Sequence, residues 1–199
     1  MKILAFSDLH HSASHAAALV QASANADLVI GAGDFCNARK NLPQAMGLLS
    51  GLAAPMVVIP GNAESVTELT QAVSADTTVL HGSSVTIDGI TLFGLGYATP
   101  ETPFGDWSCD LSEDDARGLL APCTQADILI THSPPKGIAD KTSTGVSVGS
   151  IAVFEAIERI QPKLVLCGHI HDSWGQTGHI GRSKIVNLGP HANWFDVSA

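Results

Sequence analysis

The chain has 199 residues, of which 45% are hydrophobic, and a formal net charge of -9. This length and apolar content fit a single domain over residues 1–199 with a substantial core, and the acidic balance disfavours a general binder of nucleic acids or anionic membranes, which need clustered Lys and Arg. The four cysteines form no C-x-x-C pair, and no apolar stretch is long enough for a signal-peptide core or a membrane span, so we expect reduced thiols and a soluble, cytoplasmic protein with no membrane contact.

The first part of the chain alternates between short apolar runs and helical segments. The runs at 2–6, 28–30 and 56–59 have the length and composition of buried strands. Helices are predicted over 12–24, from after Pro43 to about Leu52, and over 64–73. This order of strand, helix, strand, helix predicts an α/β fold.

The rest of the chain adds antiparallel pairing and a long loop. Strands are predicted at 78–80, 85–87 and 90–93, and Asp88-Gly89 between the last two is a strong hairpin signal, so we expect a mixed sheet. Residues 94–110, rich in Gly, Pro and Thr, predict a long ordered loop over a site. After it we expect helices at 112–120 and 148–160, strands at 128–130, 164–167, 185–186 and 194–195, and a turn containing Gly175 and Gly178.

Two histidines leave the end of the predicted strand at 164–167, in Gly168-His169-Ile170-His171. On its own the pair is ambiguous, because polar pairs at strand ends also serve packing. Four other strand ends carry residues able to ligate a metal, and sites in open α/β sheets assemble at strand ends. These residues are Asp8 and His10 after the first strand, Asp34 after the second, Asn62 after the third and His132 after the strand at 128–130.

The chemistry of these seven side chains indicates a transition-metal site. Carboxylate, imidazole and amide groups without thiolate suit Mn, Fe, Zn, Co or Ni in a hydrolytic site, and not a structural zinc. Seven ligands are too many for one tetrahedral ion. They suit two divalent ions that share a carboxylate, roughly 3.5–4 Å apart, and that act in displacement at phosphorus.

The order Asp8-x-His10, Gly33-Asp34, Gly61-Asn62, His132 and Gly168-His169-x-His171 resembles the calcineurin-like metallophosphoesterases over nearly the whole chain. The segments at 94–96, 102–105 and 131–135 are most similar to the Icc-related predicted phosphoesterases. The resemblance implies a four-layer α/β/β/α sandwich, in which two mixed β-sheets lie between helical layers and the metals lie at one edge.

The resemblance also implies a mechanism and a division of the ligands. A metal-bound hydroxide would attack the phosphoester in line with the leaving group. We expect Asp34, Asn62 and His132 to be the catalytic residues. By position, one metal would be held by Asp8, His10 and His171, the other by Asn62, His132 and His169, and Asp34 would bridge both.

The chain departs from the family pattern after Asn62, where it reads Ala63-Glu64. Many members have a histidine in place of Ala63, which is thought to steady the phosphoryl group or protonate the departing oxygen, and alanine can do neither. General acid catalysis is worth about 10²–10⁴ in rate. We therefore expect a phosphodiesterase or weak phosphatase that favours acidic leaving groups; an engineered knockout at this position is the other explanation.

The expected cofactors are two divalent transition metals, with manganese favoured over Fe, Zn, Ni or Co, and the expected partner is a small phosphoester. Monomer and homodimer both stay open. The alternative function is a weak or inactive member of the fold that serves as a protein-interaction scaffold, which would tolerate eroded ligands and expose an apolar patch. The intact ligand set favours the enzyme, and the absence of a basic groove disfavours a nuclease.

Other side chains near these motifs have both a functional and a structural interpretation. Phe104 and Trp107 would stack on an aromatic substrate group or, as we favour, pin their loop to the core. His191 would contact phosphate or belong to a structural turn. Asn37 would contact phosphate or a metal ligand, or, more simply, form an Asx turn. We expect Cys36 to be a small buried residue instead of a soft ligand. A surface or structural role is expected for His11, His15, His81 and His179.

Overall fold

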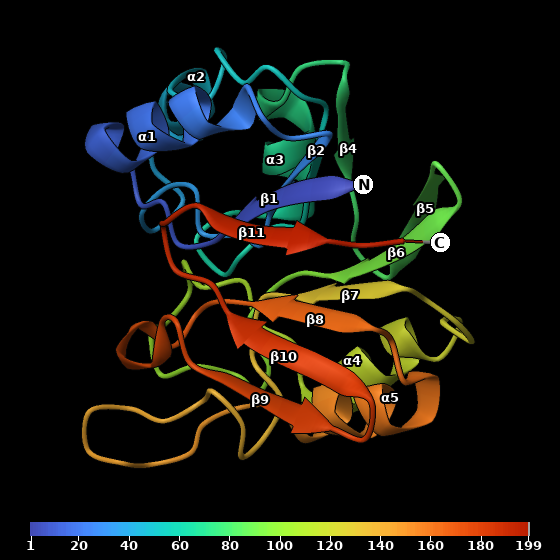
Figure 1. Cartoon of the computed structure of the whole chain (residues 1–199). Helices are drawn as coiled ribbons and strands as arrows, with labels where there is room; N and C mark the ends of the chain where they lie inside the picture. Colours follow the sequence, from blue (N-terminus) through green and yellow to red (C-terminus); the bar gives the residue numbers. More distant parts are fainter. Residues whose placement is uncertain (199) are drawn as a thin grey trace.

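The structure, a computed structural model, describes residues 1–198 and consists of four layers (Figure 1). Two β-sheets face each other in the middle of the molecule, and helices cover the outer face of each sheet. This arrangement confirms the predicted α/β/β/α sandwich with two mixed sheets.

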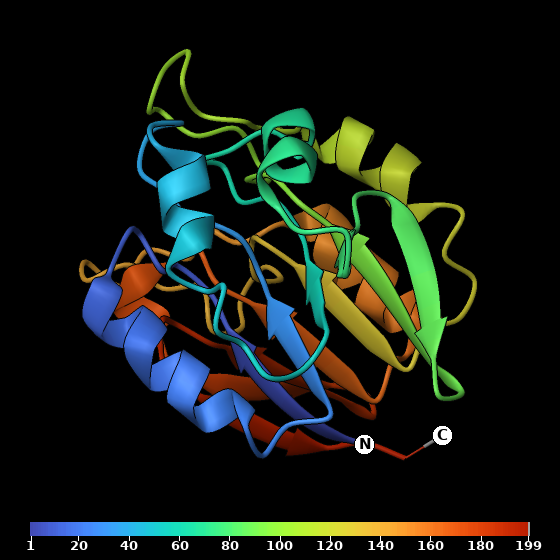
Figure 2. The same ribbon diagram turned by 90° about the horizontal axis from the view of Figure 1, so that it is seen from above.

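The first sheet combines four parallel strands with one antiparallel edge strand. The parallel strands are β1 (Lys2–Phe6), β2 (Leu28–Gly31), β3 (Met56–Val58) and β4 (Thr77–Val79). The antiparallel strand, β11 (Asn193–Asp196), pairs with β1, so the order across the sheet is β11-β1-β2-β3-β4. The last strand of the chain is therefore hydrogen-bonded to the first, and the two termini lie close together in both views (Figures 1 and 2).

The second sheet is also mixed. Its order is β5-β6-β7-β8-β10-β9, and the four inner strands are parallel to one another. The outer strands β5 and β9 are antiparallel to their neighbours, and the β5–β6 hairpin turns at Asp88-Gly89 as predicted. The six strands are β5 (Ser83–Ile87), β6 (Ile90–Leu95), β7 (Ile128–Thr131), β8 (Leu164–Cys167), β9 (Thr177–Ile180) and β10 (Ser183–Asn187).

Three hydrophobic cores separate the four layers. Successive side chains of a strand point to opposite faces, so a strand that is buried on both sides contributes to two cores. In β1, Ile3 and Ala5 lie in the core between the sheets, whereas Leu4 and Phe6 lie in the core under the first helical layer. Leu129 of β7 belongs to the third core, under the second helical layer. The continuous apolar composition of these strands follows from this double burial.

The helices form the two outer layers (Figure 2). Serine side chains cap the start of most of them, for example Ser12 and Ser150, whose hydroxyls accept backbone N–H groups of the first turn. Among the described residues, no helix is both long and apolar enough to cross a membrane. The first sheet is covered by α1 (Ala13–Ser23), α2 (Leu42–Gly47) and α3 (Val66–Ala72), and the second by α4 (Glu113–Leu120) and α5 (Ile151–Ile160).

The differences from the predicted elements have local causes. Helix α2 ends at Gly47 instead of near Leu52, because this segment is rich in glycine, a poor helix former. Helix α3 begins after its capping residue Ser65, so Glu64 lies outside the helix. Gly178 lies within β9 and not in a turn, and a 3₁₀ helix, η1 (His171–Ser173), follows β8 where no regular element was predicted.

The loops that follow the parallel strands of both sheets meet at one edge of the molecule. The arrows of β7 and β8 point toward this edge, on the left of Figure 1. The loops contact each other through the backbone: the Asp8 amide donates to the Gly33 carbonyl at 2.9 Å, and the Gly168 amide donates to the His132 carbonyl at 3.0 Å. Residues from five strands are thereby brought to one place.

Candidate metal centre

The structure brings all seven predicted ligand residues to this edge. Two groups of side chains have ligand atoms within 4.8 Å of one another: Asp8, His10 and His171 form the first group, and Asp34, His132 and His169 form the second. The seventh residue, Asn62, joins the second group because its Oδ1 atom lies 3.2 Å from His132 Nε2. These segments lie far apart in the sequence and are brought together by the order of the strands in the two sheets.

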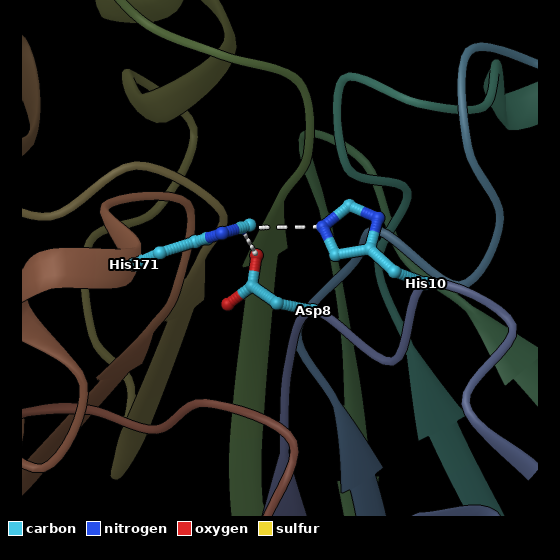
Figure 3. Close-up of side chains that lie close together, drawn as sticks. All are labelled: Asp8, His10 and His171. Carbon is cyan, nitrogen blue, oxygen red and sulfur yellow. Dashed lines mark hydrogen bonds and ion pairs between the residues drawn. The ribbon is translucent and has the colours of Figure 1, made fainter.

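In the first group, two imidazoles face each other across a carboxylate (Figure 3). The Nε2 atoms of His10 and His171 are 3.2 Å apart, and His171 Nε2 lies 3.7 Å from Asp8 Oδ1. The Asp8 side chain is 0% exposed, whereas that of His171 is 49% exposed. The first group therefore opens to solvent on the side of His171.

The second group is more buried, although His169 is partly exposed. The side chain of His132 is 0% exposed and that of Asp34 is 6% exposed. His132 Nδ1 lies 2.8 Å from the Ala32 carbonyl oxygen, and its Nε2 lies 3.4 Å from Asp34 Oδ1. The rings of His132 and His169 are in contact, with centroids 4.9 Å apart. Access from solvent to this group is much more restricted than to the first.

Asp34 connects the two groups. Its Oδ1 atom faces His132 of the second group, and its Oδ2 atom lies 3.5 Å from His10 Nε2 of the first. The Asp34 carboxylate is additionally fixed by the Ala63 backbone amide, which donates to Oδ1 at 2.8 Å. One carboxylate thus has an oxygen directed at each group.

The donor set fits bound cations. In neutral His10 and His132, Nδ1 faces a backbone carbonyl oxygen, at 3.0 Å from Cys36 and 2.8 Å from Ala32 respectively, and must carry the proton. The Nε2 lone pairs of His10 and His132 then face Asp34, and that of His10 also faces Nε2 of His171. Electron-rich atoms at these distances repel each other unless a proton or a metal ion lies between them, and a carbonyl that fixes the other ring nitrogen is the usual second partner of a metal-bound histidine.

The titration behaviour of the group follows from the same crowding. Burial alone would raise the pKa of Asp34 and lower that of His132, but their mutual attraction dominates: it lowers the pKa of Asp34 and raises that of His132 to about 9. Burial, followed by the charge on His132, lowers the pKa of His169 to about 3. Without a metal, His132 therefore holds a positive charge at the position that faces Asp34 and Asn62.

Glu64 organises the loops beneath the centre. Its carboxylate is fully buried and accepts hydrogen bonds from the backbone amides of Asp34 (2.8 Å), Gly61 (2.7 Å) and Phe35 (3.2 Å). Burial, followed by the Asp34 charge, raises the pKa of Glu64 to about 7. The sequence prediction placed Glu64 at a helix start; the structure instead shows that it ties the loop after β2 to the loop after β3.

Two further contacts orient candidate ligands and could not be anticipated from local sequence. The Asn62 Nδ2 group donates to Ser108 Oγ at 3.0 Å, and Ser108 Oγ in turn donates to Asp110 Oδ1 at 2.6 Å. These two hydrogen bonds hold the Asn62 side-chain amide so that its Oδ1 atom faces His132. Asp8 Oδ2 accepts the indole N–H of Trp174 at 3.0 Å. Both partners lie far from their ligand in the sequence, so the only signal for them is tertiary.

The backbone is strained where the candidate ligands leave the strands. Asp8, His10, Asp34 and His169 all have positive φ, at 53°, 46°, 59° and 68°. Non-glycine residues adopt this region rarely, and such strain concentrates at functional sites. Glycine is required at position 168, directly before His169, because a Cβ atom there would lie 2.5 Å from Asp8 Oδ2. The Gly-His sequence thus reflects close approach of two ligand loops.

The other residues with two sequence interpretations lie outside both groups. His11 Nε2 contacts the Lys40 carbonyl, and the ring of His15 packs on that of His191, which is exposed. Asn37 is exposed and donates to the His10 carbonyl at 3.4 Å. Cys36 is buried as predicted, with its thiol donating to the Ala63 carbonyl. The ring of His81 packs at a tilt against that of Tyr97, and His179 is exposed on β9.

The predicted packing of Phe104 and Trp107 against the core is wrong. Their side chains are exposed, at 50% and 36%, and the two rings stack on each other with centroids 5.7 Å apart and an angle of 6° between planes. The loop is anchored by its polar residues instead, because Thr102 and Ser108 both bond to the Asp110 carboxylate. The aromatic pair forms a small apolar surface on the loop that reaches Asn62.

Comparison with known proteins agrees with this geometry. Residues 1–173 match the model of the family described as Calcineurin-like phosphoesterase. The chain is 33% identical over 122 residues to metallophosphoesterase domain-containing protein 1 of Homo sapiens, over 58% of this chain and 35% of that protein. The matches cover between 26% and 37% of the lengths of the curated relatives compared, so the chain spans about a third of them.

Solved structures share the fold. TT1561 of Thermus thermophilus superposes with a TM-score of 0.73 and 19% identity, over 94% of this chain and 88% of that chain. A dimetal phosphatase from Danio rerio superposes with a TM-score of 0.64 and 14% identity, over 96% and 90% of the two chains. The family model matches most of the length of this chain, and the architecture is shared, so the chain belongs to the calcineurin-like metallophosphoesterase family.

Proposed function

We propose that the protein is a phosphoesterase that works with two divalent transition metals. The observation that carries the proposal is the Asp34 carboxylate, which directs one oxygen at a histidine of each group, at 3.4 and 3.5 Å. Asp34 would be shared between the metals. One metal would be held by Asp8, His10 and His171, and the other by Asn62, His132 and His169.

The bound metals would supply activated water near neutral pH and would neutralise negative charge on the phosphoryl group. The chain's own residues hold the donors ready for them: the carbonyls of Cys36 and Ala32 keep the protons of His10 and His132 on Nδ1. Asp34, Asn62 and His132 are the proposed catalytic residues, because they face the shared space between the groups. Manganese is the proposed metal, with Fe, Zn, Ni and Co as alternatives.

The substrate class follows from what the centre lacks as well as from what it holds. Ala63 carries no proton that could pass to a departing oxygen, and Arg39, whose backbone amide bonds to the Ala63 carbonyl, has its guanidinium paired with Glu68 at 3.0 Å. Without a proton donor at position 63, bonds to acidic leaving groups should break fastest. We propose small phosphodiesters or activated phosphomonoesters as substrates; one solved structure with the same fold is named a dimetal phosphatase.

Hydrolysis of bis-p-nitrophenyl phosphate tests the proposal. The metal-free protein should be inactive, and addition of Mn²⁺ should give hydrolysis that Asp34→Asn abolishes. Metal content is measured on the same samples, so that loss of metal is distinguished from loss of chemistry. The proposal that the protein is an enzyme would be contradicted if the wild-type chain and Ala63→His both bind two ions and neither hydrolyses a phosphoester.

That contradictory result is what the alternative function predicts. A weak or inactive member of the fold would serve as a protein-interaction scaffold, and the observation in its favour is the exposed pair Phe104 and Trp107, on the loop whose Ser108 contacts Asn62. Replacing both aromatic residues with serine distinguishes the two functions. The replacement should leave hydrolysis of the small diester largely intact if the protein is an enzyme that acts on small phosphoesters.

A further inference from the structure

Trp174 contacts two of the three residues of the first group. Its indole N–H donates to Asp8 Oδ2 at 3.0 Å, and its ring packs on the ring of His171 with centroids 4.4 Å apart and 34° between the planes. The backbone adds to this contact, because the Trp174 amide donates to the His171 carbonyl at 3.1 Å, which closes the 3₁₀ turn. One side chain therefore contacts two candidate metal ligands, the Asp8 carboxylate and the His171 imidazole.

The hydrogen bond from Trp174 helps decide which oxygen of Asp8 is free. Oδ2 also accepts from Ser7 Oγ at 2.5 Å and from the His169 amide at 3.2 Å, so three donors occupy it. Among the described residues, Oδ1 accepts one hydrogen bond, the shorter branch of the His169 amide at 3.0 Å, and it faces His171 Nε2. Asp8 is thus presented to a cation with one oxygen restrained and the other available.

The ring contact acts on the other residue, His171. This histidine is half-exposed and lies on a short 3₁₀ turn, so its side chain would otherwise lose rotamer freedom on binding a metal. Packing against a tryptophan that is itself anchored restrains the imidazole in advance, and restraint before binding raises affinity. In the second group, His132 is restrained by complete burial instead.

The tryptophan is held in place by the loop before β11. A Cβ atom on Gly189 would lie 2.7 Å from the Trp174 ring, so the backbone at Gly189 is in close contact with it. That backbone is bonded in turn to Ser7, whose amide donates to the Gly189 carbonyl at 2.8 Å and whose hydroxyl accepts the Gly189 amide at 3.0 Å. Trp174, Ser7 and Asp8 therefore form one connected unit.

We infer that Trp174 is a positioning residue for the metal of the first group and reports its occupancy. The inference rests on the proposed function, since it assumes that Asp8, His10 and His171 bind a metal. Loss of the partner that orients a ligand typically costs 10–100-fold in metal affinity. Trp174 should therefore set the affinity of the first metal and leave that of the second unchanged.

Calorimetric titration of the metal-free protein with Zn²⁺ tests the inference, using Trp174→Phe, which keeps a ring against His171 but removes the N–H donor, and Trp174→Ala, which removes both. Trp174→Phe should weaken the first metal about tenfold and Trp174→Ala toward a hundredfold. Trp194→Phe is the matched control, because Trp194 lies exposed on β11, with the Lys2 ammonium over its ring. Circular dichroism and thermal unfolding check that each variant is folded.

A second measurement uses the three tryptophans of the chain as probes. In protein labelled with 5-fluorotryptophan, the fluorine resonances are assigned from Trp107→Phe, Trp174→Phe and Trp194→Phe. The Trp174 resonance should move with the binding of the metal that His171→Ala removes, while the Trp194 resonance stays in place. The inference is overturned if both metals bind Trp174→Phe with wild-type affinity, or if the Trp174 resonance does not shift when the first metal binds. If the wild-type chain binds no metal, the proposed function itself fails.

Discussion

His10 and His171, which are 161 residues apart in the chain, hold their Nε2 atoms 3.2 Å from each other. His10 follows β1 of the first sheet, and His171 follows β8 of the second. Two imidazole nitrogens approach this closely only when a proton or a metal ion is shared nearby, because their lone pairs repel. The junction of the two sheets therefore gathers imidazole and carboxylate groups that could hold a cation, and five predictions concern this site.

The two histidines after β8 should serve different metals. His171→Ala should remove the ion bound with Asp8 and His10, and His169→Ala the ion bound with Asn62 and His132. Metal content per chain should fall from two ions to one in each variant, and anomalous scattering from crystals identifies the ion that remains. His179→Ala, on the exposed edge strand β9, is the control. Crystals in which each variant loses the opposite ion would refute this division.

The two metals should leave at different rates. The first group is open, with a His171 side chain that is 49% exposed, whereas in the second group the side chains of His132 and Asp34 are 0% and 6% exposed. A chelator should therefore remove the first metal before the second, with rates that differ by roughly tenfold or more. Stopped-flow chelation with a coloured chelator measures both phases. A single phase that releases both ions would show that the groups exchange together.

Ser108 should control the affinity of the second metal. It accepts the Asn62 amide N–H group at 3.0 Å, and without it the amide can rotate away from His132. Ser108→Ala should weaken that metal by about 10–100-fold, the usual cost of losing a partner of a ligand. Isothermal titration measures the change, and Ser84→Ala on the exposed strand β5 serves as control. An unchanged affinity would mean that His132 alone orients Asn62.

The rate of hydrolysis should depend steeply on the acidity of the leaving group. Ala63 provides no general acid, so negative charge that develops on the departing oxygen is not neutralised by a proton from this position. Across a series of aryl phosphodiesters, the logarithm of the rate should fall steeply as the pKa of the released phenol rises. A flat dependence would reveal a proton donor elsewhere. Ala63→His should flatten the slope if the histidine can reach the leaving oxygen.

The metal-free protein should lose stability as pH rises. His132 has a pKa of about 9 in the folded chain against an ordinary 6.5, so its contribution is complete below 6.5 and is lost as pH rises through 9. Glu64, raised to about 7 from 4.5, acts in the same direction at lower pH. Between pH 6 and pH 9, Tm should fall by on the order of 5 °C. Bound metal replaces the proton, so the metal-saturated protein should show little dependence. A metal-free Tm that rises over this interval would contradict the pKa shift of His132.

Local patterns were sufficient to predict the α/β alternation and antiparallel pairing, whereas the four-layer sandwich of two sheets was implied by the resemblance to the family. Apolar runs such as Lys2–Phe6 and Leu164–Cys167 are strands in the structure with the predicted bounds, because burial on both faces leaves a continuous apolar signature. The hairpin at Asp88-Gly89 follows from turn chemistry that involves only neighbouring residues. Polar residues at strand ends, such as Asp34 and His132, indicated the centre because parallel strands must end at one edge.

Contacts between distant segments were decided only by the tertiary structure. The bond of Trp174 to Asp8 joins residues 166 positions apart, and that of Ser108 to Asn62 joins residues 46 apart. Neither has a local sequence signature, because a single indole or hydroxyl in a loop can bond to many partners. Glu64 was predicted in a helix for the same reason: its four backbone donors come from loops that only the order of β2 and β3 brings together. The sequence by itself determined which side chains stand at the strand ends, and sheet order and loop packing determined which oxygen or nitrogen of each faces the centre.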